Sequence, residues 1–252
     1  MKFIKTAGEI KKMRVAGQIL ASVAKEVRNA VKIGASLKEL DKLAYQLIIK
    51  AGAEPAFLNY KPYGAAKAYP ATICASINDV VVHGIPTDYK IKDGDVVKLD
   101  FGTRYEGYNA DAAWTVGVGK FSARTKKLIS TTENALLVAI KQVKAGATIG
   151  DIGYAIHKYV SRHGFRVVKG LTGHGIGKAL HEDPSVYNEG KKGVGMRLEV
   201  GMTIAIEPMV SAGTSEVYKN DDDSYIVTDN SMSAHFEHTV LVTKDGCEIL
   251  TK

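Results

Sequence analysis

Two histidines, His174 and His181, lie in the glycine-rich segment GHGIGKALHEDP (173–184) beside acidic residues. Histidine and carboxylate side chains are common metal ligands, so this composition suggests a metal site. The spacing differs from the H-E-x-x-H pattern of a zinc protease helix, because Pro184 follows Asp183 and no histidine stands four residues after His181. The glycines also lack the G-x-G-x-x-G spacing of a nucleotide-binding loop. We interpret them as residues that let the backbone pass close to a metal site.

Four acidic residues lie on or beside apolar segments that we interpret as strands. Asp100 closes the segment DVVKLD, and Asp111 follows after the connection FGTRYEGYNA, so two adjoining strands would place these carboxylates side by side. Glu207 and Glu237 lie inside the apolar segments MTIAIEPMV and AHFEHTVLVT. A carboxylate there costs free energy unless it is paired, protonated or bound to metal. Carboxylates held close together repel one another, and a hard cation removes that penalty.

This set of side chains favours harder divalent ions over structural zinc. Four carboxylates with one imidazole are too rich in oxygen for a structural zinc site, whereas manganese, cobalt and iron accept such ligands. Carboxylates can bridge two ions, and two ions can bind and activate one water molecule. The spacing alone does not decide which histidine is the ligand. His235 and His238 flank Glu237, and strand alternation predicts that both turn away from the face of that glutamate.

The elements that must position these residues are predicted to be helices followed by strands. Thr6 and Glu9 form a T-x-x-E capping box, which predicts a helix over 6–30. A second helix is expected over 36–52, with a serine as its cap and a glycine at its end. Residues 71–119 are rich in Val, Ile, Thr and Tyr with turn residues between them, which is typical of strands.

The chain also repeats part of its own pattern. Residues 31–52 align without gaps on residues 143–164, with matched glycines in the turn and at the end of each helix. The segment DGDVVKLD, which ends at Asp100, is likewise similar to EVGMTIAIE, which ends at Glu207. Each of these is a turn glycine, an apolar strand and one carboxylate.

The repeat indicates two similar halves of about 1–121 and 122–252 within a single catalytic domain over 1–252. Helices followed by runs of strands in each half point to an α+β fold. Two such halves facing each other would bring Asp100 and Glu207 together at a pseudo-twofold axis. The metal site would then lie at the centre of the molecule.

Composition limits the class of protein. The chain has 252 residues, 45% of them hydrophobic, which supports a full core. It has no apolar run long enough for a membrane helix and no N-terminal signal-peptide pattern, and its two cysteines, Cys74 and Cys247, lie far apart in the sequence. These features predict a cytoplasmic protein with reduced thiols. The net charge of +7 fits a solvated lysine-rich surface, with weak attraction to RNA as the alternative.

Taken together, the motifs resemble the type I methionine aminopeptidases over nearly the whole chain. The matching segments are INDVVVHGIP with His83, LDFG and NADAAWTVGVG with Asp100 and Asp111, GHGIGKALHEDP with His174 and His181, TIAIEPMV with Glu207, and SAHFEHTVLVT with Glu237. The resemblance implies the pita-bread fold, in which two pseudo-symmetric halves form an antiparallel sheet backed by helices. Too few residues separate His181 from Glu207 for the insertion that type II enzymes carry in the second half.

The resemblance also implies a role for each matched residue. Two divalent ions, cobalt, manganese, iron or zinc, would be held by Asp100, Asp111, His174, Glu207 and Glu237. Asp111 and Glu237 would bridge the ions, and Glu207 would also relay protons from the attacking water. His83 and His181 would contact the substrate and stabilise the reacting peptide unit. Tyr69 and Cys74 match substrate-binding positions of the pocket.

The implied reaction is removal of the initiator methionine from a nascent protein or a peptide by attack of a metal-activated hydroxide. The expected partner is a peptide or nascent chain, and the expected protein is a monomer with no membrane association. The positive charge would give weak attraction to ribosomes. A related peptidase with Xaa-Pro preference and a binding module without enzymatic activity are the alternatives. The complete ligand set favours an enzyme.

Three segments depart from the family pattern. The segment over 57–73 is longer than usual, and it helps to build the methionine pocket. The assignment of Tyr60 and Tyr63 within it stays open. Leu180 stands where bacterial members often carry an aromatic residue, and the segment over 221–229 lacks a tryptophan that is common there. Side-chain specificity is therefore expected to depart from the family more readily than the metal chemistry.

Overall fold

The computed structural model describes residues 3–61 and 67–252. The helices are α1 (Ala7–Asn29), α2 (Leu37–Lys50), α3 (Ala123–Ile140) and α4 (Ile149–Arg162). The first strands are β1 (Glu54–Pro55), β2 (Ile73–Ile77), β3 (Val80–Val82), β4 (Val96–Tyr105), β5 (Tyr108–Gly117), β6 (Arg166–Val167), β7 (Thr172–Gly175) and β8 (Glu182–Tyr187). The remaining strands are β9 (Thr203–Ile206), β10 (Met209–Ser211), β11 (Val217–Lys219), β12 (Tyr225–Val227), β13 (Ser233–His235), β14 (His238–Val242) and β15 (Cys247–Ile249).

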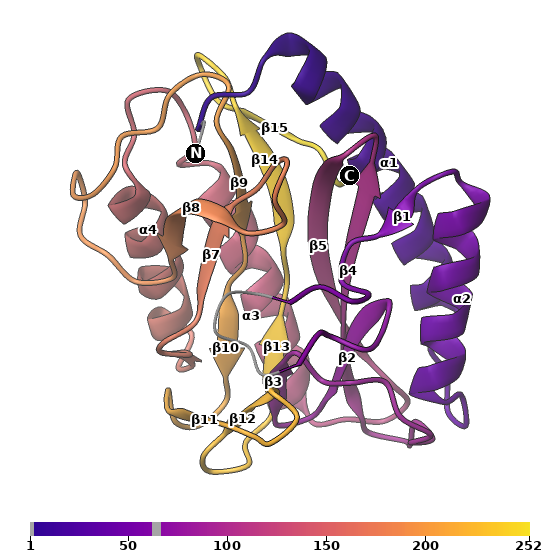
Figure 1. Cartoon of the computed structure of the whole chain (residues 1–252). Coiled ribbons are helices and arrows are strands. Elements are labelled where there is room, and N and C mark those ends of the chain that lie inside the picture. The colour runs from indigo at the N-terminus through magenta and orange to yellow at the C-terminus, as the bar shows by residue number, and fades with distance from the viewer. Residues whose placement is uncertain (1–2, 62–66) are drawn as a thin grey trace.

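In Figure 1 α1 and α2 lie on one side of the strands, α4 lies on the opposite side, and α3 lies behind the strands in the middle of the molecule. One sheet pairs β4 with β1, β2 and β5, and the largest sheet has the order β15-β14-β9-β7-β8. Every strand pairing between described residues is antiparallel. In the described part of the chain, none of the helices combines the length and the apolar character needed to cross a membrane.

The first half builds its core between two capped helices and the sheet of β4. Thr6 caps α1 with Glu9 in the predicted capping box, and Ser36 caps α2 with Glu39 in the same way. Both helices end close to the predicted positions. The apolar faces of α1 and α2 pack with the alternate strand residues that point away from the pocket, and these buried side chains include Leu20, Leu40, Val97, Leu99 and Phe101.

The β4–β5 hairpin corrects the prediction that Asp100 closes a strand. β4 continues past Asp100 to Tyr105, and the chain reverses at Glu106 and Gly107, whose φ angles are 45° and 82°. Two consecutive residues with positive φ are typical of the turns that join strands with the right-handed twist of a hairpin. The turn signal therefore lies in the Glu106–Gly107 pair, and Asp100 is a mid-strand residue.

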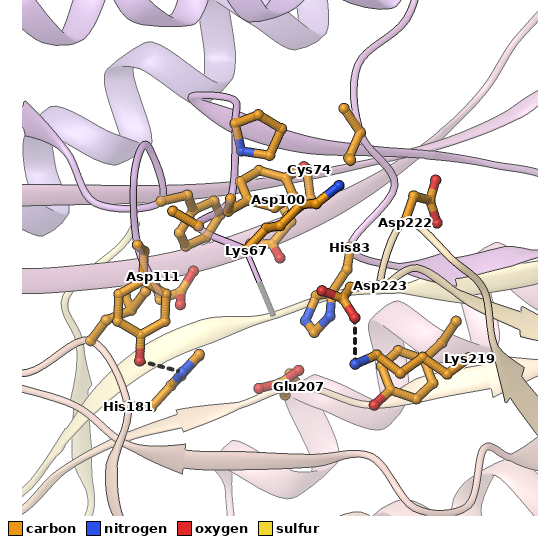
Figure 2. A pocket seen from close by; sticks show the side chains of 18 of the residues that line it. Lys67, Cys74, His83, Asp100, Asp111, His181, Glu207, Lys219, Asp222 and Asp223 are labelled. Atoms are coloured by element: carbon orange, nitrogen blue, oxygen red, sulfur yellow. Dashed lines mark hydrogen bonds and ion pairs between the residues drawn. The ribbon is translucent and has the colours of Figure 1, made fainter. Parts of the chain in front are cut away.

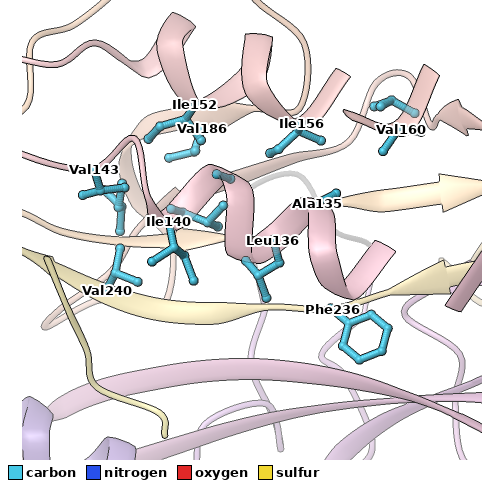
Figure 3. Close-up of a cluster of buried hydrophobic side chains, with 14 of the residues drawn as sticks. Ala135, Leu136, Ile140, Val143, Ile152, Ile156, Val160, Val186, Phe236 and Val240 are labelled. Carbon is cyan, nitrogen blue, oxygen red and sulfur yellow. The ribbon is translucent and has the colours of Figure 1, made fainter. Parts of the chain in front are cut away.

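The second half has the equivalent core between α3, α4 and the sheet of β14. Side chains from both helices meet Val240 of β14 and Phe236 just before it, and Val186 of β8 closes the cluster (Figure 3). Thr148 caps α4 in a capping box with Asp151, as Ser36 does for α2. The segment aligned with α2 in the sequence repeat therefore forms the corresponding helix.

The matched glycines of the repeat adopt matching backbone conformations. Gly34 and Gly146 have φ angles of 87° and 86°, and Gly94 and Gly201 both have φ of 91°. These are left-handed conformations, which favour glycine because a Cβ atom would be strained there. Four residues that the alignment pairs by sequence thus serve the same two turns.

Hydrogen bonds repeat in the same way. The amide of Gly34 donates to the Ile91 carbonyl over 2.8 Å, and the amide of Gly146 donates to the Leu198 carbonyl over 2.8 Å. Each bond ties the turn before a helix to the segment that precedes a central strand. The two halves therefore share local hydrogen bonding as well as element order, which agrees with the predicted pseudo-symmetric α+β fold.

Candidate metal centre

A cavity of about 730 Å³ opens between the two halves. Its polar lining includes all five residues that the sequence predicts as metal ligands: Asp100, Asp111, His174, Glu207 and Glu237. Figure 2 shows Asp100 and Asp111 coming from strands of the first half and Glu207 from the second half. The fold therefore brings together side chains that lie far apart in the sequence.

The β4–β5 hairpin places its two aspartates on one face. Asp100 is opposite Ala113, and Asp111 is opposite Gly102, so the aspartates form a diagonal pair across the two strands. Burial raises the pKa of Asp100 to about 6. Burial, together with the neighbouring acidic groups, raises the pKa of Asp111 well above its ordinary range. The prediction that these carboxylates lie side by side is confirmed by the register.

Hydrogen bonds between the two halves position Glu237 in the site. The amide of Glu237 donates to the Ala113 carbonyl over 2.9 Å, and the amide of Asp111 donates to the Thr239 hydroxyl over 3.0 Å. Asp111 therefore lies beside Glu237 because β5 is bonded along the segment between β13 and β14. Glu237 is 2% exposed, and burial raises its pKa well above the usual range.

His174 on β7 points one nitrogen at the carboxylates. Its Nδ1 lies 2.8 Å from the Gly175 carbonyl oxygen, which can only accept a hydrogen bond, so Nδ1 carries the proton. Its Nε2 lies 3.6 Å from Glu207 Oε1 and 3.8 Å from Asp111 Oδ2. A Cβ atom at Gly175 would collide with the Asp183 carbonyl of β8, so glycine is required for the close approach of these strands.

Several buried oxygens of the cluster have no hydrogen-bond partner among the described residues. They are Asp100 Oδ1, Asp111 Oδ1 and Glu237 Oε1. A buried polar atom without a partner costs free energy, and a divalent cation satisfies such oxygens directly. The donor set of carboxylates with one imidazole nitrogen therefore fits divalent metal ions.

Three groups of possible ligand atoms overlap in this cluster, and one of them consists of atoms of Asp111, His174 and His181. Atoms of Asp100, Asp111 and Glu237 lie within 4.8 Å of one another, and so do atoms of His174, Glu207 and Glu237. Glu237 belongs to both groups. These two groups therefore share one carboxylate.

His235 corrects the prediction that both histidines beside Glu237 turn away from it. The buried His235 ring places Nε2 3.5 Å from Glu207 Oε2 and 4.0 Å from Glu237 Oε2. Strand alternation fails here because β13 ends at His235 and β14 begins at His238, so the two residues between them break the pleat. His238 does turn away, and its Nδ1 lies 2.9 Å from the Thr251 hydroxyl. Sequence periodicity could not detect this break.

His83 and His181 stand on opposite sides of the cavity (Figure 2). The His181 ring packs 4.4 Å from that of His174, centroid to centroid, and its Nδ1 lies 2.9 Å from the Tyr60 hydroxyl. The His83 ring lies 5.7 Å from that of Tyr225 on β12. Desolvation lowers the pKa of His83 to about 4 and that of His181 to about 3, so both imidazoles are neutral near pH 7.

Apolar side chains form one wall of the cavity: Phe57, Tyr60, Tyr69, Cys74 and Leu180. Cys74 pairs with Asp100 across β2 and β4, so this wall adjoins the carboxylates. The Tyr69 hydroxyl donates to the carbonyls of Ile73 and Gly84, which leaves its ring to face the cavity.

Tyr60 is a residue whose assignment the sequence left open. The structure places its hydroxyl at His181, and burial raises its pKa. Tyr63 of the same long segment lies outside the described residues. Leu180 is 4% exposed, so the position without the aromatic residue is still an apolar part of the wall.

Comparisons with known proteins identify a family of metallopeptidases. Residues 11–244 match metallopeptidase family M24. The chain is 46% identical to the methionine aminopeptidase of Mycoplasma capricolum, covering 99% of this chain and 98% of that protein. It is 47% identical to the methionine aminopeptidase of Aquifex aeolicus, covering 97% and 96%. The crystal structure of the Thermotoga maritima methionine aminopeptidase superposes with a TM-score of 0.95 at 42% identity, covering 100% of both chains. The chain therefore belongs to metallopeptidase family M24 and, within it, to the methionine aminopeptidases.

Proposed function

We propose that this protein cleaves the N-terminal methionine from peptides and nascent chains in a reaction that depends on two divalent metal ions. The observation that carries the proposal is the convergence of four carboxylates and one imidazole at the floor of a cavity with an apolar wall. A binding module would have no need for buried, mutually repelling carboxylates. A hydrolase does need them, because they hold cations at the bond that is cleaved.

Asp100, Asp111, His174, Glu207 and Glu237 are the proposed ligands. The overlap of the two ligand groups at Glu237 supports two ions instead of one, since a shared carboxylate can bridge them. When bound, the ions would polarise the peptide carbonyl and lower the pKa of the attacking water. The oxygens without hydrogen-bond partners support this assignment.

Glu207 is the proposed proton carrier. In the metal-free site burial raises its pKa to about 7, and a carboxylate beside the attacking water is a group that can accept a proton and release it again. It would take a proton from the attacking water and deliver it to the amine of the leaving peptide. Its Oε2 also lies 3.5 Å from His235 Nε2, which limits the orientations that the carboxylate can adopt.

The neutral histidines would bind the reacting peptide unit. With the Tyr60 hydroxyl donating to His181 Nδ1, the Nε2–H of His181 is free to donate to the oxygen that gains negative charge. His83, held against Tyr225 across the cavity, would donate near the scissile nitrogen. The apolar wall would hold the methionine side chain and leave the amino end at the carboxylates.

The experiment is a peptidase assay with Met-Gly-X peptides and with Ala-Pro-X peptides as the comparison. We expect release of free methionine, loss of activity with a chelator, and recovery when manganese, cobalt or iron is added back. Preference for Ala-Pro-X would support the Xaa-Pro peptidase. Hydrolysis of neither peptide with any of the metals would support the binding module. The monomeric state and the weak attraction to ribosomes stay predictions.

A further inference from the structure

Lys98 is a lysine buried in the interior between the two halves. It is 1% exposed and lies on β4 two residues before Asp100, so both side chains project from the same face of the strand. Its strand neighbours Val97 and Leu99 point the other way into the apolar core of the first half. The proposed reaction assigns no role to Lys98.

The side-chain nitrogen of Lys98 is bound to backbone carbonyls, and burial lowers the pKa of this lysine to about 7. Its Nζ donates to the Asn78 carbonyl over 2.7 Å and to the Ser233 carbonyl over 3.3 Å. Among the described residues, no carboxylate lies close enough to Lys98 to form an ion pair. The amide and hydroxyl of Ser233 also donate to the Asn78 carbonyl, each over 2.9 Å. Lys98 therefore joins three segments of the backbone at one point.

Each of these segments leads to the metal centre. The strand of Lys98 continues to Asp100. The turn of Asn78 continues through β3 to His83, and β13 runs from Ser233 to His235 and then to Glu237. One side chain thus links the first half to the second directly behind the carboxylates.

Neighbouring residues of the same sheet make similar links. Ser76 and Thr115 flank Lys98 in the register of β2, β4 and β5. The Ser76 hydroxyl accepts from the amide of Gly84, next to His83, and the Thr115 hydroxyl donates to the His235 carbonyl over 2.6 Å. Ser76, Lys98 and Thr115 therefore form a row of polar side chains across the sheet, with Lys98 at its centre, and each is hydrogen-bonded to backbone beneath the site.

We propose that Lys98 is a positioning residue for the metal centre, holding Asp100, His83 and the β13–β14 segment in the arrangement that the ions and the peptide require. The proposal rests on the proposed function. Lys98 does not line the cavity, and it acts through the backbone that carries the site residues. Without its donors, the buried Ser233 carbonyl loses a hydrogen bond, the Asn78 carbonyl keeps only those from Ser233, and the seam beneath the site can shift.

The direction of the change in metal affinity separates positioning from a simple effect of charge. Removing a positive charge near a cation site would by itself strengthen binding of Mn²⁺, because like charges repel. Loss of the ligand arrangement would weaken it. In Lys98→Met we therefore expect the Kd for Mn²⁺, measured by calorimetry, to rise about 10-fold and kcat/KM to fall about 10- to 100-fold, as misplacement of reacting groups does.

The matched control is Lys120→Met, which removes the same charge from an exposed position. We expect it to stay within about twofold of the unaltered protein in both quantities. Cleavage of Met-Gly-X by the unaltered protein and by this control tests the proposed function separately. If neither of these two proteins cleaved Met-Gly-X, the proposed function would be refuted. If Lys98→Met matched them in Kd and kcat/KM, only the positioning role would be refuted.

Chemical rescue provides the second measurement. Lys98→Ala, purified in ammonium chloride, leaves a space beside the Asn78 and Ser233 carbonyls that an ammonium ion can enter. We expect ammonium chloride to restore kcat/KM at least about fivefold, while tetramethylammonium chloride of equal ionic strength does not, because it lacks N–H donors. A lowered Tm with unchanged metal affinity and no rescue would overturn the proposal. So would variants that fail to fold even in ammonium chloride, because Lys98 would then serve stability alone.

Discussion

At the residue scale, the site depends on acidic side chains that are buried, where an ionised carboxylate costs free energy. Asp111 and Glu237 are 3% and 2% exposed, and each has an oxygen without a hydrogen-bond partner among the described residues. Such carboxylates raise one another's pKa, and the free energy that their ionised forms cost is relieved by protonation or by binding of a cation. His83 and His181 have a different role. Desolvation lowers their pKa, so both are neutral and can still donate a hydrogen bond.

Replacement of Glu207 by glutamine should separate proton transfer from binding. The amide cannot accept a proton from water at neutral pH, so we expect kcat to fall about 10²- to 10⁴-fold with a much smaller change in KM. Steady-state kinetics on Met-Gly-X peptides with a parallel measurement of metal content would check this. Glu189→Gln, at an exposed acid paired with His157, is the control. A Glu207→Gln protein with kcat near that of the control would exclude the proton-carrier role.

Replacement of Tyr60 by phenylalanine should weaken the contribution of His181. The change removes the hydroxyl that lies 2.9 Å from His181 Nδ1 and keeps the ring in the apolar wall. Loss of one hydrogen bond of this kind predicts a decrease in kcat/KM of about 2- to 10-fold with little change in Tm. Tyr45→Phe, at an exposed tyrosine of α2, should behave like the unaltered protein. If Tyr60→Phe did the same, the hydroxyl would have no role in orienting the imidazole.

At the scale of elements, the two halves position their acidic side chains in different ways. The first half uses one continuous hairpin, in which the register of β4 and β5 makes Asp100 and Asp111 diagonal neighbours. The second half uses interruptions, because Glu207 lies between β9 and β10 and Glu237 lies between β13 and β14. An interrupted strand lets a residue leave the pleat and point at a site that regular alternation would not reach.

The helix caps provide a test of the repeat. Ser36 and Thr148 are the buried N-caps of α2 and α4, the helices that correspond in the two halves. We expect Ser36→Ala and Thr148→Ala each to lower the free energy of unfolding by about 1 kcal/mol, as for other caps. In a chain of this size that corresponds to a decrease in Tm of about 2–4 °C by calorimetry.

Activity at room temperature should not change in these variants, because both caps lie outside the cavity lining. Ser130→Ala, within α3 at an exposed position, removes a serine hydroxyl that caps no helix and should leave Tm unchanged or slightly higher. A large decrease in Tm for one cap variant and none for the other would show that the two equivalent helices do not contribute equally to stability.

At the scale of the whole molecule, the metal centre exists only where the halves meet. The Ala113–Glu237 backbone pair and the Asp111–Thr239 bond join the sheets of the two halves. Four acids thereby gather in one interior region, and their charge makes the stability of the folded chain depend on pH and on metal.

The metal-free protein should lose stability as pH rises. In the folded state burial raises the pKa of Asp100 to about 6 and that of Glu207 to about 7, above their ordinary values of 3.8 and 4.5. The folded chain therefore binds more protons than the unfolded chain between about pH 4 and 7, and its free energy of unfolding falls as these protons leave. We expect a contribution on the order of 3 kcal/mol from each of these two groups across this window, because one pKa unit corresponds to about 1.4 kcal/mol.

Urea unfolding of metal-free and Mn²⁺-saturated protein at several pH values would measure this dependence. The stabilisation by Mn²⁺ should grow with pH, because the ion binds the ionised carboxylates. Equal stabilisation by Mn²⁺ at about pH 5 and about pH 8 would contradict the coupling between these acids and the metal.

The sequence by itself determined much of the local structure. Capping boxes at Thr6 and Ser36, the strand-rich middle and the repeat of 31–52 in 143–164 correspond to elements at nearly the predicted positions. These features depend on contacts between residues close together in the chain, such as a cap hydroxyl and an amide three residues later. Sequence patterns therefore predict them well.

Only the tertiary structure decided how the site is assembled. It placed His235 against Glu207, carried β4 beyond Asp100, brought Tyr60 to His181 and set Lys98 beneath the seam. Each of these depends on a strand register, a break in the pleat or a contact between residues far apart in the chain. Such contacts are set by packing of one half against the other, and periodicity within a short segment carries no information about that packing.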